Sequence, residues 1–395
     1  MDREMTKTLA YINGGKICFG CGACVSACPN ACITLKSDVE GFSYPAIDFS
    51  ACVKCGACIR KCPVNAPAAD NGEPEFFSVR HGDIAVRSAS TTGGAFTALS
   101  DAVLARGGVV AGAVWTSGFK VMHVLAADAC GRDAMRYSKY VQSDSSAIFK
   151  PVAEALNSGR RVLFSGTPCQ VAAMYSFLGG RPGGLFTVDF ICHGVPSPQV
   201  LHGYLRYLEE RHGSAVAAVR FRDQRLGCVP MRMGIDFADG STYSADCDHD
   251  LYFRLFLSGI ANRSCCARCP YTRVRRDSDL TIADNWRFKA FAPEWDDNTG
   301  VSALLVNTRK GRALLDEAGG ALEIRKCRLA DIDQHYLHRP GGEHPDRELF
   351  FRALRRRGFA SAAADFTGPR PLLRRLRSRF LKILRAAGGR GRSGS

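Results

Sequence analysis

The stretch C-F-G-C-G-A-C-V-S-A-C-P at residues 18–29 returns 34 positions later as C-V-K-C-G-A-C-I-R-K-C-P at residues 52–63. Both follow C-x2-C-x2-C-x3-C-P, a spacing typical of chains that hold two 4Fe-4S clusters. In that arrangement three thiolates of one stretch and the last thiolate of the other hold each cluster. The sequence therefore predicts two clusters, one held by Cys18, Cys21, Cys24 and Cys62 and the other by Cys52, Cys55, Cys58 and Cys28.

Zinc sites and disulfides are the alternative interpretations of these cysteines. Zinc is usually bound by four thiolates in separated pairs, which fits two runs of four with matching prolines poorly. Gly20, Gly22 and Gly56 would let the backbone pass close to an inorganic core. Cys32 lies just past the first run, where we expect a small core residue rather than a ligand.

Length and cysteine usage bound the class of protein. At 395 residues the chain exceeds one ordinary domain. Nine of its 18 cysteines fall within the first 62 residues, mostly at cluster spacing, and the first 15 residues lack the apolar core of a signal peptide. We therefore expect a reducing, cytoplasmic environment. No run of about 18 apolar residues predicts a membrane span.

The positive charge is concentrated at the C-terminal end. Of the formal net charge of +15, residues 366–395 contribute +9 and no acidic residue, which leaves +6 for the rest. Basicity of this kind does not predict that the whole protein binds nucleic acid, and no nucleic-acid partner is expected.

The same segment has an apolar stripe at helical spacing. Its members are Leu372, Leu373, Leu376, Phe380, Ile383 and Leu384, with Arg and Lys between them. One hypothesis is peripheral binding to the inner face of the membrane, with the basic side toward anionic headgroups. The alternative is that the stripe packs on the protein's own core or on a partner. The Gly/Arg/Ser end is expected to be disordered.

Three regions follow from the composition: residues 1–70 as an α+β double-cluster module, 76–345 as an α/β domain, and 346–395 as a helical, basic tail. A Pro- and Ala-rich linker separates the first two. The α/β domain shows two consecutive strand-turn-helix units, which favour a mainly parallel sheet. Antiparallel strands are expected near 219–222 and 231–244, the latter folded at Asp239-Gly240.

Four further cysteines suggest a third cluster. Cys169 and Cys192 each follow a predicted strand, and Cys266 and Cys269 form a C-x2-C pair. Strand ends of one parallel sheet open into a common crevice, so the four thiolates could hold a third 4Fe-4S cluster. Cys265 could substitute for Cys266, and some of the four could instead be buried bystanders, as we expect of Cys130, Cys228, Cys247 and Cys327.

Several polar residues also lie at predicted strand ends or helix starts. The Thr91-Thr92-Gly93-Gly94 turn precedes a predicted helix, where N–H groups and the helix dipole favour phosphate; taken alone the signal is weak, because turns of this kind without a ligand are common. Thr167 could line the same cleft. His193 could donate a proton beside a redox centre, or be an ordinary turn histidine. Lys139-Tyr140 could contact a cofactor or be a surface pair.

Taken together, the motifs resemble a known family. The segments, in order, are S-T-T-G-G-A-F (90–96), S-K-Y-V-Q-S-D (138–144), L-F-S-G-T-P-C-Q (163–170), D-F-I-C-H-G-V-P-S-P (189–198), F-R-D-Q-R-L-G (221–227) and C-A-R-C-P-Y (266–271). The chain resembles the coenzyme F-420 hydrogenase/dehydrogenase beta-subunit family, in a form fused to a double-cluster ferredoxin domain. The resemblance covers about residues 15–310. Relatives carry an aromatic Gly-Asp-Phe-Trp-Gly turn where this chain has Ala283-Asp284-Asn285-Trp286-Arg287.

The resemblance implies an iron–sulfur flavoprotein. By it, FAD would contact the turn that ends in Gly94, the segment Lys139, Tyr140 and Gln142, and the turn Thr167-Pro168. We expect an oxidoreductase that relays electrons between a soluble ferredoxin or similar redox protein and a small two-electron acceptor. A flavin can join the two because it exchanges one or two electrons. The alternative is a non-catalytic electron-transfer subunit of a larger complex.

Overall fold

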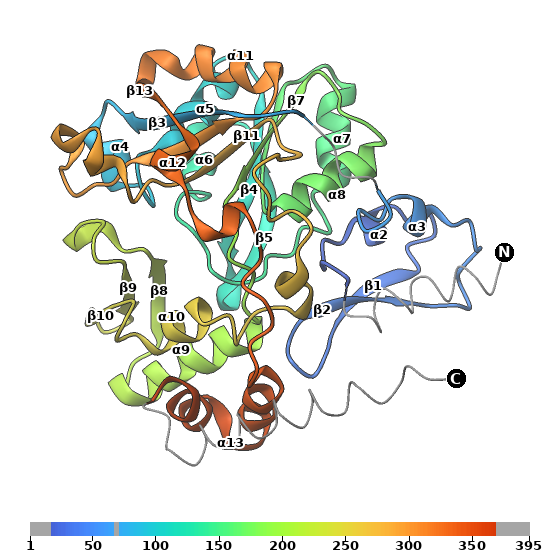
Figure 1. The fold of residues 1–395 in the computed structure, drawn as a ribbon. Coiled ribbons are helices and arrows are strands. Elements are labelled where there is room, and N and C mark those ends of the chain that lie inside the picture. Colours follow the sequence, from blue (N-terminus) through green and yellow to red (C-terminus); the bar gives the residue numbers. More distant parts are fainter. Residues whose placement is uncertain (1–16, 67–70, 369–395) are drawn as a thin grey trace, which may run out of the picture.

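The computed structural model describes residues 17–66 and 71–368. They form a small N-terminal module attached to the side of a larger α/β body (Figure 1). Within these two ranges, no helix combines the length and the apolar character that crossing a bilayer requires. The apolar stripe predicted at 372–384 lies outside the described residues, so its two interpretations stay predictions.

The module is built from two short helices and one hairpin. Helices α2 (Ala23–Ser26) and α3 (Ala57–Arg60) follow Gly22 and Gly56, whose φ values of 76° and 72° suit glycine. Strands β1 (Ile33–Ser37) and β2 (Ser43–Ile47) pair antiparallel. The predicted α+β cluster-binding module is confirmed in its secondary structure.

The large body is organised around an eight-stranded sheet of order β13-β3-β12-β11-β7-β6-β4-β5. Its four central strands are parallel: β4 (Val109–Thr116), β6 (Val162–Ser165), β7 (Leu185–Phe190) and β11 (Leu280–Asp284). The outer strands join antiparallel: β3 (Glu75–His81), β5 (Lys120–Ala126), β12 (Ser302–Val306) and β13 (Leu322–Cys327). The predicted α/β domain with a parallel sheet and antiparallel additions is confirmed.

Helices cover both faces of this sheet because alternate strand residues point to opposite sides. On one face, Val110 and Leu163 pack against α5 (Ala95–Leu104) and α11 (Arg309–Ala318). On the other, Val109 and Phe164 pack against α7 (Phe149–Asn157) and α8 (Pro168–Leu178). Three shorter helices lie in the connections: α4 (Ile84–Ser88), α6 (Ala129–Asp133) and α12 (Leu329–Ile332).

A second layer is inserted between β7 and β11. It contains a three-stranded antiparallel sheet of β8 (Val216–Phe221), β9 (Arg232–Phe237) and β10 (Thr242–Asp246). The sheet shares an apolar core with α9 (Pro198–His212), α10 (Leu251–Leu257) and α13 (Arg347–Thr367). The hairpin predicted at Asp239-Gly240 is the β9–β10 turn, where Gly240 has φ 83°.

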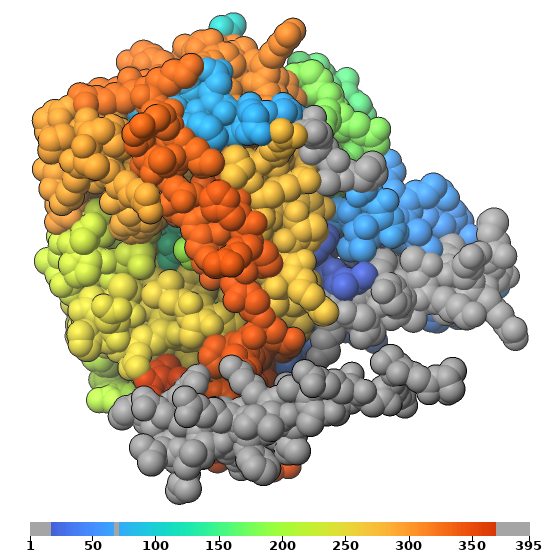
Figure 2. All heavy atoms as spheres, viewed as in Figure 1, coloured from blue at the N-terminus to red at the C-terminus, as the bar shows by residue number. Residues whose placement is uncertain are grey.

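The chain after α12 returns from the large sheet to this second layer. Figure 2 shows it as the orange-red segment that crosses the front face from top to bottom. It includes Gln334 and Tyr336 and ends at α13. Helix α13 contributes Phe350, Phe351 and Phe359 to the apolar core. The early part of the predicted helical tail is thus packed on the body.

Candidate functional site

Two small hollows in the module each bring a predicted quartet of cysteines together. The inner quartet is Cys18, Cys21, Cys24 and Cys62. The outer quartet is Cys28, Cys52, Cys55 and Cys58. Each takes three thiols from one run and the fourth from the other, which is the grouping that the spacing predicts.

The chemistry of both quartets suits iron. Burial raises the pKa of Cys24 to about 12, and the neighbouring thiols of Cys18 and Cys62 add to this rise. Thiols that share a hollow cannot all ionise beside one another unless cations compensate their charge. Iron bound to the thiolates supplies such cations, so the donor set fits two 4Fe-4S clusters.

The fifth cysteine of the module, Cys32, lies in the wall of the outer hollow. Its Sγ is 3.3 Å from Cys28 Sγ, and its side chain is buried. The contact with Cys28 raises the pKa of Cys32 to about 12. Cys32 therefore remains a neutral thiol that can donate to Cys28, in keeping with the expected small core residue.

The two quartets differ in their surroundings. Cys55 is exposed, and Phe49 and Val53 beside the outer hollow are each 60 % exposed. The inner quartet faces the large body instead. Ser145 Oγ donates to Cys21 O at 2.8 Å, and the backbone of Gly22 lies against Ser146. The outer quartet thus lies at the surface and the inner quartet at the junction with the domain.

A third quartet gathers from three separate segments of the domain. Cys169 lies in the first turn of α8, Cys192 follows β7, and Cys266 and Cys269 lie in and just after the turn Ser264–Arg268. Burial raises the pKa of Cys192, and Cys266, Cys169 and Cys269 raise it further because their thiols face it. Gly194, with φ 99°, makes room because a Cβ there would lie 3.2 Å from Cys266 Cβ.

The third quartet consists of four thiols, the donor type that 4Fe-4S clusters use. Among the described residues, no three His, Cys, Asp or Glu side chains converge to hold one metal ion. A cubane differs because each thiolate binds its own iron. Cys266 faces Cys192, and Cys265 contacts Cys266.

A cavity of about 390 Å³ opens where β6, β7 and β11 end. Most residues proposed from the sequence line it, although they come from four segments of the chain. They are Thr91, Thr92, Gly94, Lys139, Tyr140, Gln142, Thr167, Cys169, Cys192 and His193. Ligands of open α/β sheets bind at this edge, and the volume is typical of a small-molecule site.

Gly93 and Pro168 are not among the residues that line this cavity, and their expected contact with FAD stays a prediction. A Cβ on Gly93 would lie 2.6 Å from Ser302 N and 2.7 Å from Val79 O, so this glycine lets the turn pack on β12 and β3. Pro168 is buried as the first residue of α8, where a missing N–H costs nothing.

The Thr91-Thr92 turn is fixed by hydrogen bonds to distant segments. Thr91 Oγ1 accepts from Ser138 N at 2.8 Å, and Gln224 Nε2 donates to Thr91 O at 2.7 Å. Thr92 Oγ1 donates to Val301 O at 3.2 Å. The turn therefore joins the 138–142 segment to the loop before β12.

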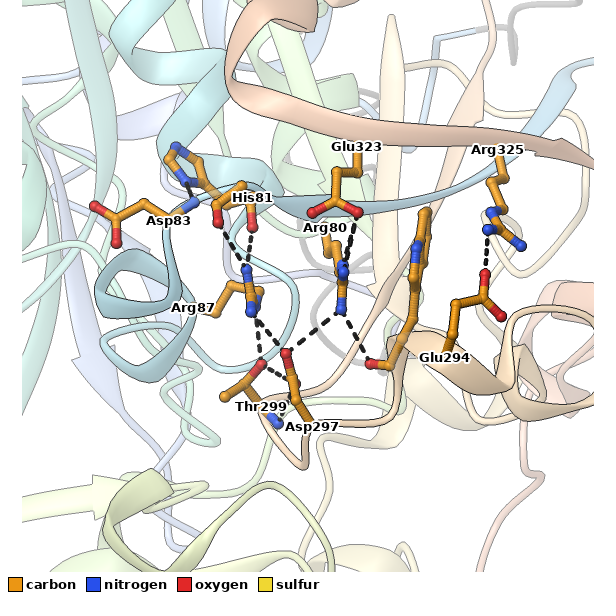
Figure 3. A network of polar contacts seen from close by, with 11 residues as sticks. Arg80, His81, Asp83, Arg87, Glu294, Asp297, Thr299, Glu323 and Arg325 are labelled. Carbon is orange, nitrogen blue, oxygen red and sulfur yellow. Dashed lines mark hydrogen bonds and ion pairs between the residues drawn. The ribbon is translucent and has the colours of Figure 1, made fainter.

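That loop is held in turn by the polar network of Figure 3. Arg87 of α4 donates to Asp297 Oδ2 at 2.6 Å and to Thr299 Oγ1 at 2.9 Å. Arg80 of β3 contacts the same carboxylate at 3.4 Å and Glu323 at 3.0 Å. The network fastens the loop that supports the Thr91-Thr92 turn.

Lys139 and Tyr140 are not an exposed surface pair. Burial lowers the pKa of Lys139 to about 7, and its Nζ donates to the carbonyl oxygens of Met135, Arg136 and Tyr137. The ring of Tyr140 stacks on Phe256 with centroids 4.7 Å apart. Lys139 thus shapes a turn that brings Arg136 and Tyr137 to the cavity.

His193 is surrounded by aromatic side chains and by the charged or titratable groups of Asp284, His335 and Arg222. Its ring stacks on Tyr336 of the crossing segment at 4.1 Å, and Phe256 lies on the same wall at 6.4 Å. Its backbone oxygen accepts from Asn262 Nδ2. The imidazole lines the cavity, where it could exchange a proton with a bound molecule.

Sequence reasoning missed a buried ion pair in the cavity wall. Arg222, at φ 62°, donates to both oxygens of Asp284 at 2.8 and 2.9 Å and lies 5.2 Å from the centroid of Trp286. Burial opposes the charge of Arg222, but Asp284 raises the pKa of the guanidinium, which stays charged. Asp284 ends a strand beside β7, so strand-end reasoning could have found it.

Two comparisons with protein families match this chain. Residues 17–66 match the 4Fe-4S dicluster domain. Residues 159–330 match the family described as the C terminus of the coenzyme F420 hydrogenase/dehydrogenase beta subunit. Both parts of the resemblance expected from the sequence are therefore confirmed.

Comparisons with whole proteins are less informative. No curated protein matches the chain. A solved structure, the xenon derivative of the F420-reducing [NiFe] hydrogenase complex from Methanosarcina barkeri, contains a chain with 17 % identity and a TM-score of 0.44. That alignment covers 75 % of this chain and 93 % of the other.

Proposed function

The chain joins a 4Fe-4S dicluster domain to a domain of the coenzyme F420 hydrogenase/dehydrogenase beta-subunit family, and we propose that it is an iron–sulfur flavoprotein oxidoreductase. It would exchange electrons with a one-electron redox protein, such as a ferredoxin, at the module. It would exchange them with a small two-electron acceptor at the cavity. FAD bound in the cavity would connect the one-electron partner with the two-electron acceptor, because a flavin exchanges either one or two electrons.

One observation carries this proposal. The cavity is lined both by the Thr91-Thr92 turn and by Cys169 and Cys192 of the third quartet. A molecule in the cavity would therefore lie beside the thiols that can hold a cluster. Electron transfer needs this proximity, and a purely structural set of cysteines does not.

The cavity offers groups for both ends of a dinucleotide. Gly94 is the N-cap of α5, so N–H groups and the positive end of the helix dipole would face the region where a pyrophosphate would lie. Arg136 adds a cation there. Near Cys192, apolar rings such as Tyr140 and Phe256 provide surfaces for a flat ring system.

The third quartet would stand between the module and the cavity. Tyr271 lies among Cys169, Cys21 and Cys269, whose thiols raise its pKa together with burial. The ring of Phe19, next to Cys18, contacts Tyr271 at 5.5 Å and also lines the cavity. The inner and third quartets are thus neighbours across a thin layer of side chains.

The two ends of the proposed path have different surfaces. At the module, Phe49, Val53 and Cys55 are exposed beside the outer quartet, where a redox protein could dock. At the cavity, Trp286 and Phe190 are partly exposed apolar side chains. We propose that the acceptor enters there and that His193 supplies or takes its proton.

The direct test is anaerobic purification of the full chain with iron, sulfide and flavin quantified. Three clusters would give roughly twelve irons per chain. The proposed enzyme would also contain one FAD, whose absorbance changes when the flavin is reduced. A preparation with a full set of clusters but no flavin, even after incubation with excess FAD, would overturn the proposal that the chain is an enzyme. The remaining interpretation would then be a non-catalytic electron-transfer subunit.

The third quartet needs its own test. Replacing Cys169 and Cys266 by Ser should remove roughly four irons per chain and leave the module's clusters intact. The matched control replaces Cys130 and Cys247, which belong to no quartet, and should leave the iron content unchanged. Equal iron in both variants would show that the third quartet holds no cluster.

A further inference from the structure

We propose that Arg263 is a buried, uncompensated cation that raises the reduction potential of the inner quartet's cluster above that of the outer quartet's cluster. Electrons that enter at the surface would then move inward. The inference rests on the proposed function only for the role of this inward electron transfer, which would be to supply electrons to the cavity. It needs only the two clusters of the dicluster domain.

The backbone of Arg263 links two segments of the third quartet. Its N–H donates to Val195 O at 3.0 Å, in the turn after Cys192, and its carbonyl accepts from Cys266 N at 3.0 Å. The residue begins the turn Ser264–Arg268. Its position is therefore set by the same segments that carry Cys192 and Cys266.

The side chain reaches from there into the module. Nε donates to Cys18 O at 2.8 Å, and Nη1 donates to Gln142 Oε1 at 3.1 Å. The guanidinium lies 4.0 Å from the ring centroid of Tyr44, on β2. Arg263 is 1 % exposed, and its Nη2 is buried without a hydrogen-bond partner. One side chain thus contacts the inner quartet, the cavity wall and the module's hairpin.

The charge of Arg263 is not neutralised by a carboxylate within the described part of the chain. Arg347 at the same junction is a useful contrast. It is equally buried, but it pairs with both oxygens of Glu40 at 3.0 and 2.5 Å. A buried cation is costly unless it has an anionic partner. Burial opposes the charge of Arg263, but the neighbouring Cys18 and Cys265 raise the pKa of the guanidinium, which stays charged.

This charge bears directly on reduction. Addition of one electron makes a cluster and its thiolates more negative, and a nearby cation stabilises that state more in a buried site than in water. The outer quartet has Arg60, whose Nη1 donates to Cys55 O at 2.8 Å, but this contact is exposed and screened. Arg263 therefore favours the electron on the inner side.

The stoichiometry of the step is simple. One electron leaves the reduced outer cluster, which is oxidised, and enters the oxidised inner cluster, which is reduced. The one-electron redox protein of the proposed function restores the outer cluster. No bond or proton needs to move.

Gly20 makes this contact sterically allowed. A Cβ at this position would lie 2.3 Å from Gln142 Nε2 and 2.8 Å from Arg263 Nη1, and Gly20 has φ 68°. Glycine here therefore permits the approach of the guanidinium to the cluster loop, in addition to the turn itself.

The test is a redox titration of the full, cluster-loaded chain followed by electron paramagnetic resonance. A Cys55→Ser variant identifies the signal of the outer cluster. The inner cluster should be reduced at the higher potential. In Arg263→Met the potential of the inner cluster should become more negative. In Arg263→Lys it should lie close to the value of the unaltered chain. The potential of the outer cluster should stay constant in both variants. Iron and flavin are quantified in the same samples, so that loss of flavin, which bears on the proposed function, is separated from the shift.

The matched control is the double variant Glu40→Gln, Arg347→Gln. It removes a guanidinium from the same junction without changing the net charge, so neither potential should move. An inner potential at or below the outer one in the unaltered chain would overturn the proposal, even if Arg263→Met failed to fold. An unchanged inner potential in a folded Arg263→Met would overturn it too.

Discussion

The N-terminal module and the α/β domain are held together by different means. The buried apolar cluster of the module consists of Cys28, Cys32 and Ile33, and its two helices have four residues each. The domain buries large side chains on both faces of its sheet, such as Phe164 and Phe186. Helices as short as α2 and α3 are not stable alone. The module therefore depends on its clusters, and the domain depends on burial of apolar surface.

This difference agrees with the different roles of the module and the domain. Thiolate spacing fixes the clusters locally, so the module can expose Phe49 and Val53 at its surface without losing its fold. The domain must bring distant segments together to form a cavity, which requires a large core. The junction between them combines polar contacts and close glycine packing, as at Arg347 and Gly22, with burial of the module's Phe42 in the apolar core of the large body.

Removal of the iron–sulfur clusters should have the largest effect, and it should destabilise the module rather than the domain. Oxidative destruction of the clusters followed by chelation should unfold residues 17–66, because metal binding and folding are coupled in small metal domains. The domain should keep its sheet. Hydrogen exchange read by mass spectrometry should show complete loss of protection in the module and retained protection in β4, β6 and β7. Uniform loss across both parts would contradict the contrast.

Arg347→Met should be the most damaging substitution at the junction. It leaves the carboxylate of Glu40 partly buried without its partner and removes the bond from Nε to Asn262 O at 2.8 Å. Such a loss costs roughly 3–5 kcal/mol of unfolding free energy. Chemical denaturation measures it. The double variant with Glu40→Gln should recover part of the loss, and additive costs would show that the pair is not coupled.

The domain should carry its own pH dependence through His123. Burial lowers its pKa to about 4, its Nε2 lies 3.2 Å from Ser165 O, and its ring stacks on Phe164. The unfolded chain protonates this residue near pH 6.5, whereas the folded chain does not until about pH 4. Above about pH 6.5 His123 therefore takes nothing from the free energy of unfolding. As the pH falls to 4, the unfolded chain takes up this proton and the free energy of unfolding falls by about 3 kcal/mol.

Unfolding free energies between pH 4 and 7 test this prediction. His123→Leu should flatten the slope in that range. The control His249→Gln removes an exposed histidine and should leave the slope unchanged. An equal slope in the unaltered chain and in His123→Leu would contradict the assignment.

Gly22→Ala should have the smallest effect of the four. Its Cβ would lie 2.6 Å from Ser146 Cα at a φ of 76°, so both backbone strain and a steric clash oppose it. Gly240→Ala is the matched control, because it has φ 83° but nothing within 4 Å. Gly22→Ala should cost roughly 1–3 kcal/mol more than this control. Equal costs would show that the module does not press on the segment before α7 at this point.

The sequence alone determined the parts of the molecule that depend on local order. Cysteines at fixed spacing predict cluster ligands because one loop can supply three thiolates to one cube and its last thiolate to the other. The strand-turn-helix units placed Cys169, Cys192 and Thr167 at strand ends, and the structure gathers them at one cavity. Strand β13 was not predicted, because its charged, partly exposed residues mask the strand pattern.

Only the tertiary structure decided which distant groups meet. Arg263 lies 245 positions from Cys18 in the sequence, yet it donates to the Cys18 carbonyl. Arg222 and Asp284 pair across 62 positions, and Gly93 serves packing rather than the cavity. A single arginine in a loop has no local signature, because its partner is chosen by how the sheet, the inserted layer and the module pack. Burial then sets its electrostatic effect, since the same charge at the surface would be screened by water and salt.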